Sequence, residues 1–470
     1  MINSIEKNAI MQFLKVYVIS SIIFLFYLYI IINAEFNNTN LLSIFLFITI
    51  GLYSYSILFK TITRNAFSLN MMHWFFCFVF YGMAGFIQYL NGSFVYQLNV
   101  PDHTLIYVLL VIIVWMISYY VGSKNITNNG SIGTKITTLL QKKLEFNFPF
   151  VIISTIICII ITIHVISQGG FNALLSRSTA GNAFLQETAA ESSLMSALMR
   201  NFVLYALAFS IIYCRKYKKA IVPVFIMLLC CLIVNPIFGL ARFNVAIVYL
   251  GTAILFFRNI KNSKLFIIIF FIGFVVLFPM INVFRNISLN EVSFDLLIDT
   301  IDDISRNFLS GDYDSFSMVI NTINHISHHG VSYGYQFIGA VLFFIPRSIW
   351  HDKPFGSGYT VRLEQGESFL NVSSPLIAES LINFGLIGVI LIGFLLGKAT
   401  TFIDKVYWRN NISETLDNTY IGILYPYLLS MFFFMNRGDL LSSFSFSISH
   451  IAIFTFMFWI NNSFFSRVSK

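Results

Sequence analysis

The sequence predicts an all-α polytopic membrane protein with about 12 transmembrane helices, and two observations carry that prediction. Of its 470 residues, 57% are hydrophobic and only 11% are charged, which is too apolar for a soluble globular chain. Apolar runs of roughly 17–24 residues recur along the chain, and each is long enough to cross a hydrocarbon core of about 30 Å as a helix.

The expected spans divide the chain into three parts. Residues 1–281 form an N-terminal transmembrane bundle of about nine spans, residues 282–373 form one large loop, and residues 374–470 form a C-terminal transmembrane bundle of about three spans. The individual spans are expected at 11–33, 41–59, 71–90, 104–122, 149–167, 194–214, 220–240, 243–257, 264–281, 375–397, 419–436 and 443–461.

The charges predict how these spans are oriented. When the loops are assigned alternately to two sides, one side receives 20 of the 29 Lys and Arg residues and five of the 21 acidic residues. The side rich in cations is expected to be cytoplasmic, so both termini are cytoplasmic and the large loop is periplasmic. The net charge of +8 then reflects topology, and no nucleic-acid partner is predicted.

The cations on the far side of the membrane are of an unusual type. Eight of these nine residues are Arg, against five of twenty on the cytoplasmic side. A guanidinium fits phosphate and carboxylate groups through a planar fork of donors. This bias indicates a phosphate- or carboxylate-bearing ligand, although pairing with the sixteen far-side acids would also explain it. The candidate ligand-binding cations are Arg177, Arg242, Arg347, Lys353 and Arg437.

The large loop is expected to contain two short membrane-associated elements. An amphipathic helix is predicted from the 3-4-3-4 spacing of its apolar residues, Phe294, Leu297, Ile301, Ile304 and Phe308. The apolar run from Phe337 to Pro346 is too short to span and predicts a re-entrant or interfacial helix. The turn at Pro354–Gly358 should expose backbone N–H groups to an anion.

Metal binding is considered at two places in this loop, and no metal or other cofactor is predicted. His325, His328 and His329 would share one face of a helix, but no carboxylate or Cys accompanies them at close spacing. Asp312 and Asp314 have the spacing of a metal-binding Asp-x-Asp pair without further support. The histidines are instead expected to form hydrogen bonds near a sugar-binding site.

Glu379 is the first candidate for a general base. The chain re-enters the membrane at Ser373, where Ser373 suits an N-cap and Pro375 the first helical position. Glu379 then lies about one turn inside the helix, either as a desolvated base or as a carboxylate favoured by the helix dipole. The glycines of this span predict close helix packing; they are Gly385, Gly388, Gly393 and Gly397.

These features resemble the Wzy-type O-antigen (oligosaccharide repeat-unit) polymerases of bacterial inner membranes. In motif detail the resemblance rests on Arg242 after a Gly-containing turn, on Pro346-Arg-Ser-Ile-Trp-x-x-Lys-Pro354, and on Ser374-Pro-Leu-Ile-Ala-Glu-Ser-Leu-Ile-Asn-Phe-Gly-Leu-Ile-Gly388. Arg347 and Gly358 match the Arg-x10-Gly spacing of such loops. The far-side loop that holds Arg177 departs from this pattern, since it has Thr at that spacing.

The resemblance implies a glycosyltransferase that joins undecaprenyl-diphosphate-linked oligosaccharides at the periplasmic face. It implies the lipid bilayer and a chain-length regulator as further partners. The Arg and Lys residues would then hold the leaving diphosphate. The base would be Glu379, with Asp352 and His329 as weaker alternatives. Two other functions stay open. One is an O-antigen ligase of the same architecture. The other is a lipid-linked oligosaccharide flippase, which would be expected to have charged residues midway along its transmembrane helices.

Overall fold

The computed structural model describes nine stretches of the chain together with isolated positions between 21 and 32 and at 266, 270 and 273. The expected spans at 11–33 and 264–281 and most of the Phe294–Phe308 helix lie outside the described residues. The described elements are all helices, with isolated bridge contacts but no β-strand. The nine stretches are 40–96, 99–124, 131–145, 147–169, 191–237, 240–257, 307–367, 369–408 and 418–463.

Seven described helices are long and apolar enough to cross a membrane, and they fit a multi-pass membrane protein. They are α2 (Leu41–Asn65), the continuous run of α3 (Leu69–Phe76), η1 (Cys77–Ala84) and α4 (Gly85–Leu90), α5 (Asp102–Lys124), α7 (Phe148–Gly169), α9 (Glu191–Tyr217), α21 (Leu376–Trp408) and α23 (Leu440–Ser463). Each coincides with an expected span, whereas the count of twelve stays a prediction.

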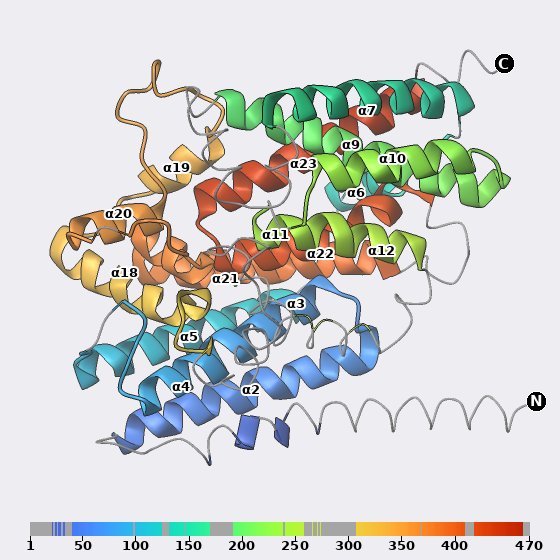
Figure 1. Ribbon diagram of the computed structural model, residues 1–470. Helices are drawn as coiled ribbons and strands as arrows, with labels where there is room; N and C mark the ends of the chain where they lie inside the picture. The colour runs from blue at the N-terminus through green and yellow to red at the C-terminus, as the bar shows by residue number, and fades with distance from the viewer. Residues whose placement is uncertain are drawn as a thin grey trace, which may run out of the picture.

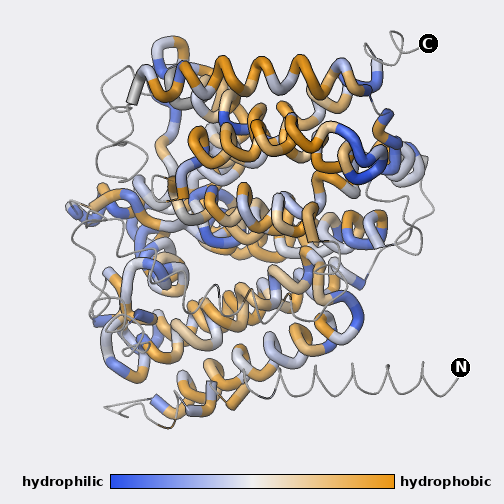
Figure 2. The backbone as a smooth tube through the Cα atoms, turned by 45° about the vertical axis from the view of Figure 1, so that its right-hand side comes forward, coloured by the Kyte–Doolittle hydropathy of each residue, from blue (hydrophilic) through white to orange (hydrophobic). Residues whose placement is uncertain are grey.

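Shorter helices occupy three more of the expected spans. They are α10 (Ile221–Val234), the run of α11 (Arg242–Val245), η3 (Ala246–Leu250) and α12 (Gly251–Phe256), and α22 (Tyr420–Arg437). A further short helix, α6 (Ser131–Leu140), lies between α5 and α7 along the chain. Figure 2 shows apolar residues along the lengths of the helices and hydrophilic residues gathered mostly toward their two ends.

The helices of the N-terminal and C-terminal parts pack together as one bundle (Figure 1). The closest pair is α5 and α21. Gly122 of α5 lies against the carbonyl of Phe394, and Gly397 of α21 lies against the carbonyl of Tyr119, so a side chain at either glycine would overlap backbone. Small residues at such contacts let two membrane helices approach closely. Gly397 therefore has the packing role that the sequence predicts.

One end of the bundle collects basic loops. The Asp404 carboxylate near the end of α21 accepts hydrogen bonds from the Leu69 N–H at the start of α3 (2.9 Å) and from the Tyr425 hydroxyl in α22 (2.6 Å). The Asn462 amide at the end of α23 donates to the carbonyl of Lys143 (2.9 Å). Lys143 also pairs with Thr419, just before α22. The basic segment before α7 and the ends of α21 and α23 therefore lie at this end, which we call the basic end.

The opposite end is formed by the starts of α2, α5, α21 and α23. The Asn40 amide, which precedes α2, donates to the Asp102 carboxylate of α5 (3.0 Å). The backbone N–H of Leu440 in α23 donates to Glu379 of α21 (3.0 Å). Since α5 and α21 run in the same direction, these two contacts lie at the same end of the bundle. We call it the acidic end.

Helix α21 is broken near this end, at Gly385. Gly385 has φ +62° and ψ −151°, a backbone conformation that is essentially restricted to glycine. The freed backbone groups find partners in the chain before α19 (Tyr335–Val341), since the Ser332 N–H donates to the Ile382 carbonyl (2.7 Å) and the Gly334 N–H to the Asn383 carbonyl (3.1 Å). The break separates the segment that carries Glu379 from the long remainder of α21.

Two details of the predicted α21 span are therefore wrong. Gly385 supplies the break instead of a packing face, because no residue with a Cβ adopts its conformation without strain. Ser373 is not the N-cap: its N–H (3.1 Å) and its hydroxyl (2.6 Å) both donate to Asp314. The helix begins at Leu376, and the Pro375 carbonyl accepts the N–H of Glu379 (3.0 Å).

Replacing Gly385 should destabilise the protein. A Cβ at this φ and ψ costs about 1–3 kcal/mol, so we expect Gly385→Ala to lower the thermal unfolding temperature of the purified protein in detergent. Gly133 in α6 is a matched control, because a Cβ there meets open space within a regular helix. Unchanged unfolding of Gly385→Ala, with Gly133→Ala as reference, would contradict the required backbone conformation.

Candidate active site

Three short helices and a helical turn cover the acidic end of the bundle. They are η6 (Gly311–Tyr313), α18 (Ser315–His329), α19 and α20 (Ser357–Glu364). Figure 1 shows α18, α19 and α20 gathered at one end of the longer helices. The predicted apolar helix at Phe337–Pro346 is in part α19, which ends at Val341 and is followed by turns, since Pro346 cannot donate a helical hydrogen bond.

Glu379 lies buried beneath this cover. Its side chain is only 3% exposed, and both carboxylate oxygens accept hydrogen bonds. The Ser357 hydroxyl at the start of α20 donates to Oε2 (2.7 Å), and the Leu440 N–H donates to Oε1 (3.0 Å). A buried carboxylate needs such donors because its desolvation is costly. Glu379 thus connects α21, α20 and α23.

A second carboxylate, Asp439, lies beside Glu379. It accepts hydrogen bonds from the Gly358 N–H (3.2 Å) and the Ser442 N–H (3.3 Å). Gly358 follows Ser357 and Leu440 follows Asp439, so the same two backbone segments hold both carboxylates. Burial raises the pKa of Asp439 above its ordinary value. Two neighbouring carboxyl groups in a dry site can hold and exchange one proton.

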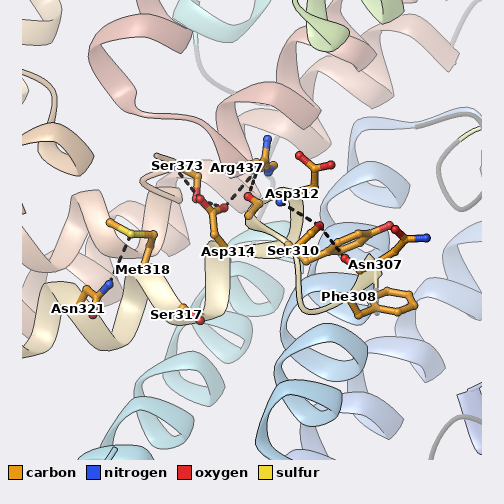
Figure 3. A network of polar contacts seen from close by, with 12 residues as sticks. Asn307, Phe308, Ser310, Asp312, Asp314, Ser317, Met318, Asn321, Ser373 and Arg437 are labelled. Carbon is orange, nitrogen blue, oxygen red and sulfur yellow. Dashed lines mark hydrogen bonds and ion pairs between the residues drawn. The ribbon is translucent and has the colours of Figure 1, made fainter. Parts of the chain in front are cut away.

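Arg437 stands two residues before Asp439, at the end of α22. Its guanidinium donates to the Gly311 carbonyl (3.1 Å) and lies 3.3 Å from the Asp314 carboxylate (Figure 3). Asp314 also accepts the two hydrogen bonds from Ser373. The Nε atom of Arg437 is buried without a hydrogen-bond partner among the described residues. Arg437 therefore retains donor capacity for an anion.

A second arginine faces the same region. Arg362 in α20 lies over the ring of Tyr96, with its guanidinium carbon 4.4 Å from the ring centre. It is paired with Glu367 at 3.2 Å, and within the described part of the chain its buried Nε has no hydrogen-bond partner. The hydroxyl of Tyr96 lies against Gly311, the residue whose carbonyl Arg437 contacts. Tyr96 thus lies between the two arginines.

Arg347 and Lys353, the two predicted phosphate ligands of the loop, are turned onto their own backbone. Arg347 donates to the carbonyls of Lys353 and Pro354, and its guanidinium carbon lies 3.9 Å from the ring centre of Phe355. Lys353 is buried and donates to the carbonyls of Phe343 (2.7 Å) and Ile345 (2.9 Å). Burial, together with the charge of Arg347, lowers the pKa of Lys353.

The remaining predicted site residues lie elsewhere or outside the described residues. Asp352 is exposed, and its carbonyl accepts the Tyr335 hydroxyl. His329 is exposed at the last residue of α18, about 20 Å along that helix from Asp314. Arg242 begins α11, but its side chain is not among the described parts, and Arg177 lies outside the described residues. The structure therefore links Arg437 to Glu379 only through the short connection between α22 and α23, where Leu440 donates to Glu379, and it places His329 at the far end of α18.

The sequence analysis missed the roles of Asp314, Ser357, Arg362 and Asp439. Asp314 belongs to the Asp-x-Asp pair considered for metal binding, and Asp439 follows the candidate Arg437 by two residues. Only the folded chain reveals that one binds Arg437 and that the other adjoins Glu379, because these contacts join residues far apart in sequence. The sole signal in the sequence was a cluster of acids and arginines around the large loop.

Comparisons with known proteins found no match for this chain. No protein-family model matches the chain, and neither a curated protein nor a solved structure matches it. The arrangement itself offers two carboxylates, one buried and one half-buried, that can exchange a proton. Two residues before the second one, Arg437 has a buried Nε without a hydrogen-bond partner among the described residues. Such a set can deprotonate a hydroxyl group next to a bound anion.

Arg347→Lys tests the internal role of Arg347. A Lys side chain cannot donate to two carbonyls in a planar fork or lie flat on Phe355, so we expect lower thermal stability by about 1–3 kcal/mol. Unfolding of the purified protein in detergent measures the change. Arg64→Lys, at an exposed position near the end of α2, is the control. Equal stability of both variants would mean that the fork contributes nothing.

Proposed function

We propose that this protein is a membrane glycosyltransferase that polymerises lipid-diphosphate-linked oligosaccharide repeat units, with undecaprenyl diphosphate as the leaving group. The observation that carries the proposal is the buried Glu379 next to Asp439, with Arg437 two residues away. The resemblance of the loop and re-entry motifs to O-antigen polymerases supports the same reaction.

In the proposed reaction, a sugar hydroxyl of the incoming repeat unit attacks C1 of the growing chain. The new C1–O bond forms while the bond from C1 to the diphosphate oxygen breaks, and the hydroxyl proton passes to the Glu379–Asp439 pair. The raised pKa of Asp439 favours this acceptance of a proton. Arg437, with its unpartnered Nε, stabilises the charge that develops on the leaving diphosphate.

We further propose that the acidic end faces the periplasm of a bacterial inner membrane. The basic segment before α7, with Lys142 and Lys143, lies at the other end, where Asp404 joins α21 to α3 and α22, and clustered Lys and Arg favour the cytoplasmic side. With the acidic end outside, the candidate site would meet lipid-linked sugars at the outer leaflet.

The positions of the buried carboxylates favour an enzyme over a flippase. Asp404 lies at the basic end, whereas Glu379 and Asp439 lie at the acidic end. Among the described residues, no Asp or Glu is buried midway along a spanning helix. A transporter that moves a charged lipid across the membrane would be expected to carry charged groups there. A ligase would use the same site with a different acceptor.

Purified protein in detergent should lengthen lipid-diphosphate-linked repeat units without a membrane gradient. Glu379→Gln keeps the shape of the side chain but cannot accept the proton, so the rate should fall by about 10²-fold or more. Separation of the sugar chains by length measures the product. Asp352→Asn, at an exposed carboxylate, should retain activity.

Three outcomes would count against this proposal. Wild-type chain lengths from Glu379→Gln together with loss in Asp352→Asn would move the base to Asp352. Translocation of intact lipid-linked units into sealed vesicles, without lengthening, would indicate a flippase. Transfer to a lipid A core acceptor alone would indicate a ligase.

Reporter fusions test the orientation. Alkaline phosphatase is active only outside the cytoplasm, so a fusion after Gly311 at the acidic end should be active and one after Lys216 at the end of α9 inactive. Activities are compared after normalising to the amount of each fusion in the membrane. The reverse pattern would place the candidate site in the cytoplasm and overturn the proposed reaction.

A further inference from the structure

The cover of the acidic end contains a second cluster of functional side chains, remote from Glu379. His325 and His329 stand four residues apart on α18, and their rings stack with centroids 4.9 Å apart. Glu364, the last residue of α20, approaches both. Its Oε2 lies 2.6 Å from Nδ1 of His325 and 3.4 Å from Nε2 of His329. One ligand atom from each residue lies within 4.8 Å of the others.

Glu364 supplies the carboxylate that the sequence does not place near these histidines. It reaches His325 and His329 because α20 packs against α18. Two histidines at positions i and i+4 with a carboxylate from another helix form a common ligand set for zinc. Ligands about 2.1 Å from a tetrahedral zinc ion stand about 3.4 Å apart. The His329–Glu364 separation has this value, and His325 and Glu364, now 2.6 Å apart, would move apart to hold an ion.

His325 is the least exposed member of this cluster. Its side chain is 9% exposed, and its Nδ1 lies 2.6 Å from the Glu364 carboxylate. His329 and Glu364 are 54% and 36% exposed. The cluster therefore presents one buried and two accessible ligands, and solvent can fill a fourth position.

We propose that His325, His329 and Glu364 bind one divalent transition-metal ion of the zinc type at the outer surface of this cover. The ion would join the end of α18 to the end of α20. The opposite ends of these two helices lie at the candidate active site, where Asp314 precedes α18 and Ser357 begins α20. The metal thereby stabilises the cover, and this inference does not depend on the proposed reaction.

Zinc binding by the full-length protein tests the proposal. The protein is purified without a His tag, treated with EDTA, and titrated with Zn²⁺ against a chromogenic chelator, with bound zinc counted by elemental analysis. We expect one ion per chain. His329→Ala and Glu364→Gln each remove a ligand. Losing a residue that only hydrogen-bonds to a ligand typically lowers metal affinity about 10–100-fold, so the zinc affinity of these variants should fall by more than that. His328→Ala changes an exposed neighbour on α18 and should bind like the wild type.

Two further measurements separate metal binding from general damage to the fold. Zn²⁺ should raise the thermal unfolding temperature of the wild type and of His328→Ala, but not that of His329→Ala or Glu364→Gln. Co²⁺ should give the visible absorption of a low-symmetry site with imidazole ligands. The proposal fails if the wild type binds no stoichiometric zinc, or if the folded His329→Ala and Glu364→Gln variants bind it as tightly as His328→Ala.

Discussion

The burial of Glu379 is the constraint on which the acidic end of this protein depends. A carboxylate with 3% exposure must find donors within the protein, and it finds them in the Ser357 hydroxyl and the Leu440 N–H. These two contacts fix the start of α20 and the start of α23 against α21. Asp439, which precedes Leu440, is thereby placed next to Gly358.

The break in α21 makes this arrangement possible. Gly385 ends the regular helix, and Asn383 just before it accepts the Phe337 N–H (2.9 Å), so that the start of α19 is fixed to α21. The loop then returns through Lys353 and Arg347, whose charges are occupied by backbone carbonyls. Their role in the structure is to shape the turn that delivers Ser357 to Glu379. Arg437 and Arg362 each keep a buried Nε without a hydrogen-bond partner among the described residues.

Some features of this membrane protein can be predicted from its sequence and others cannot. Length and hydropathy locate the helices, because an apolar run of sufficient length has few alternatives to a spanning helix. Glu379 is found in the same way, since a lone carboxylate near the start of an apolar helix is conspicuous. The contacts of Arg347 and Lys353 with backbone carbonyls are not foreseen, because the sequence cannot show whether a cation faces a ligand or the chain's own carbonyls.

The sequence by itself determined the helical membrane class and the positions of the described spans, and it singled out Glu379 and Arg437 as candidates. These depend on composition and on local periodicity. The tertiary structure alone decided that Asp439 adjoins Glu379, that Asp314 binds Arg437, and that Glu364 meets His325. Each of these contacts joins residues 39 to 123 positions apart, and the packing of α18, α20 and α22 against α21 brings them together.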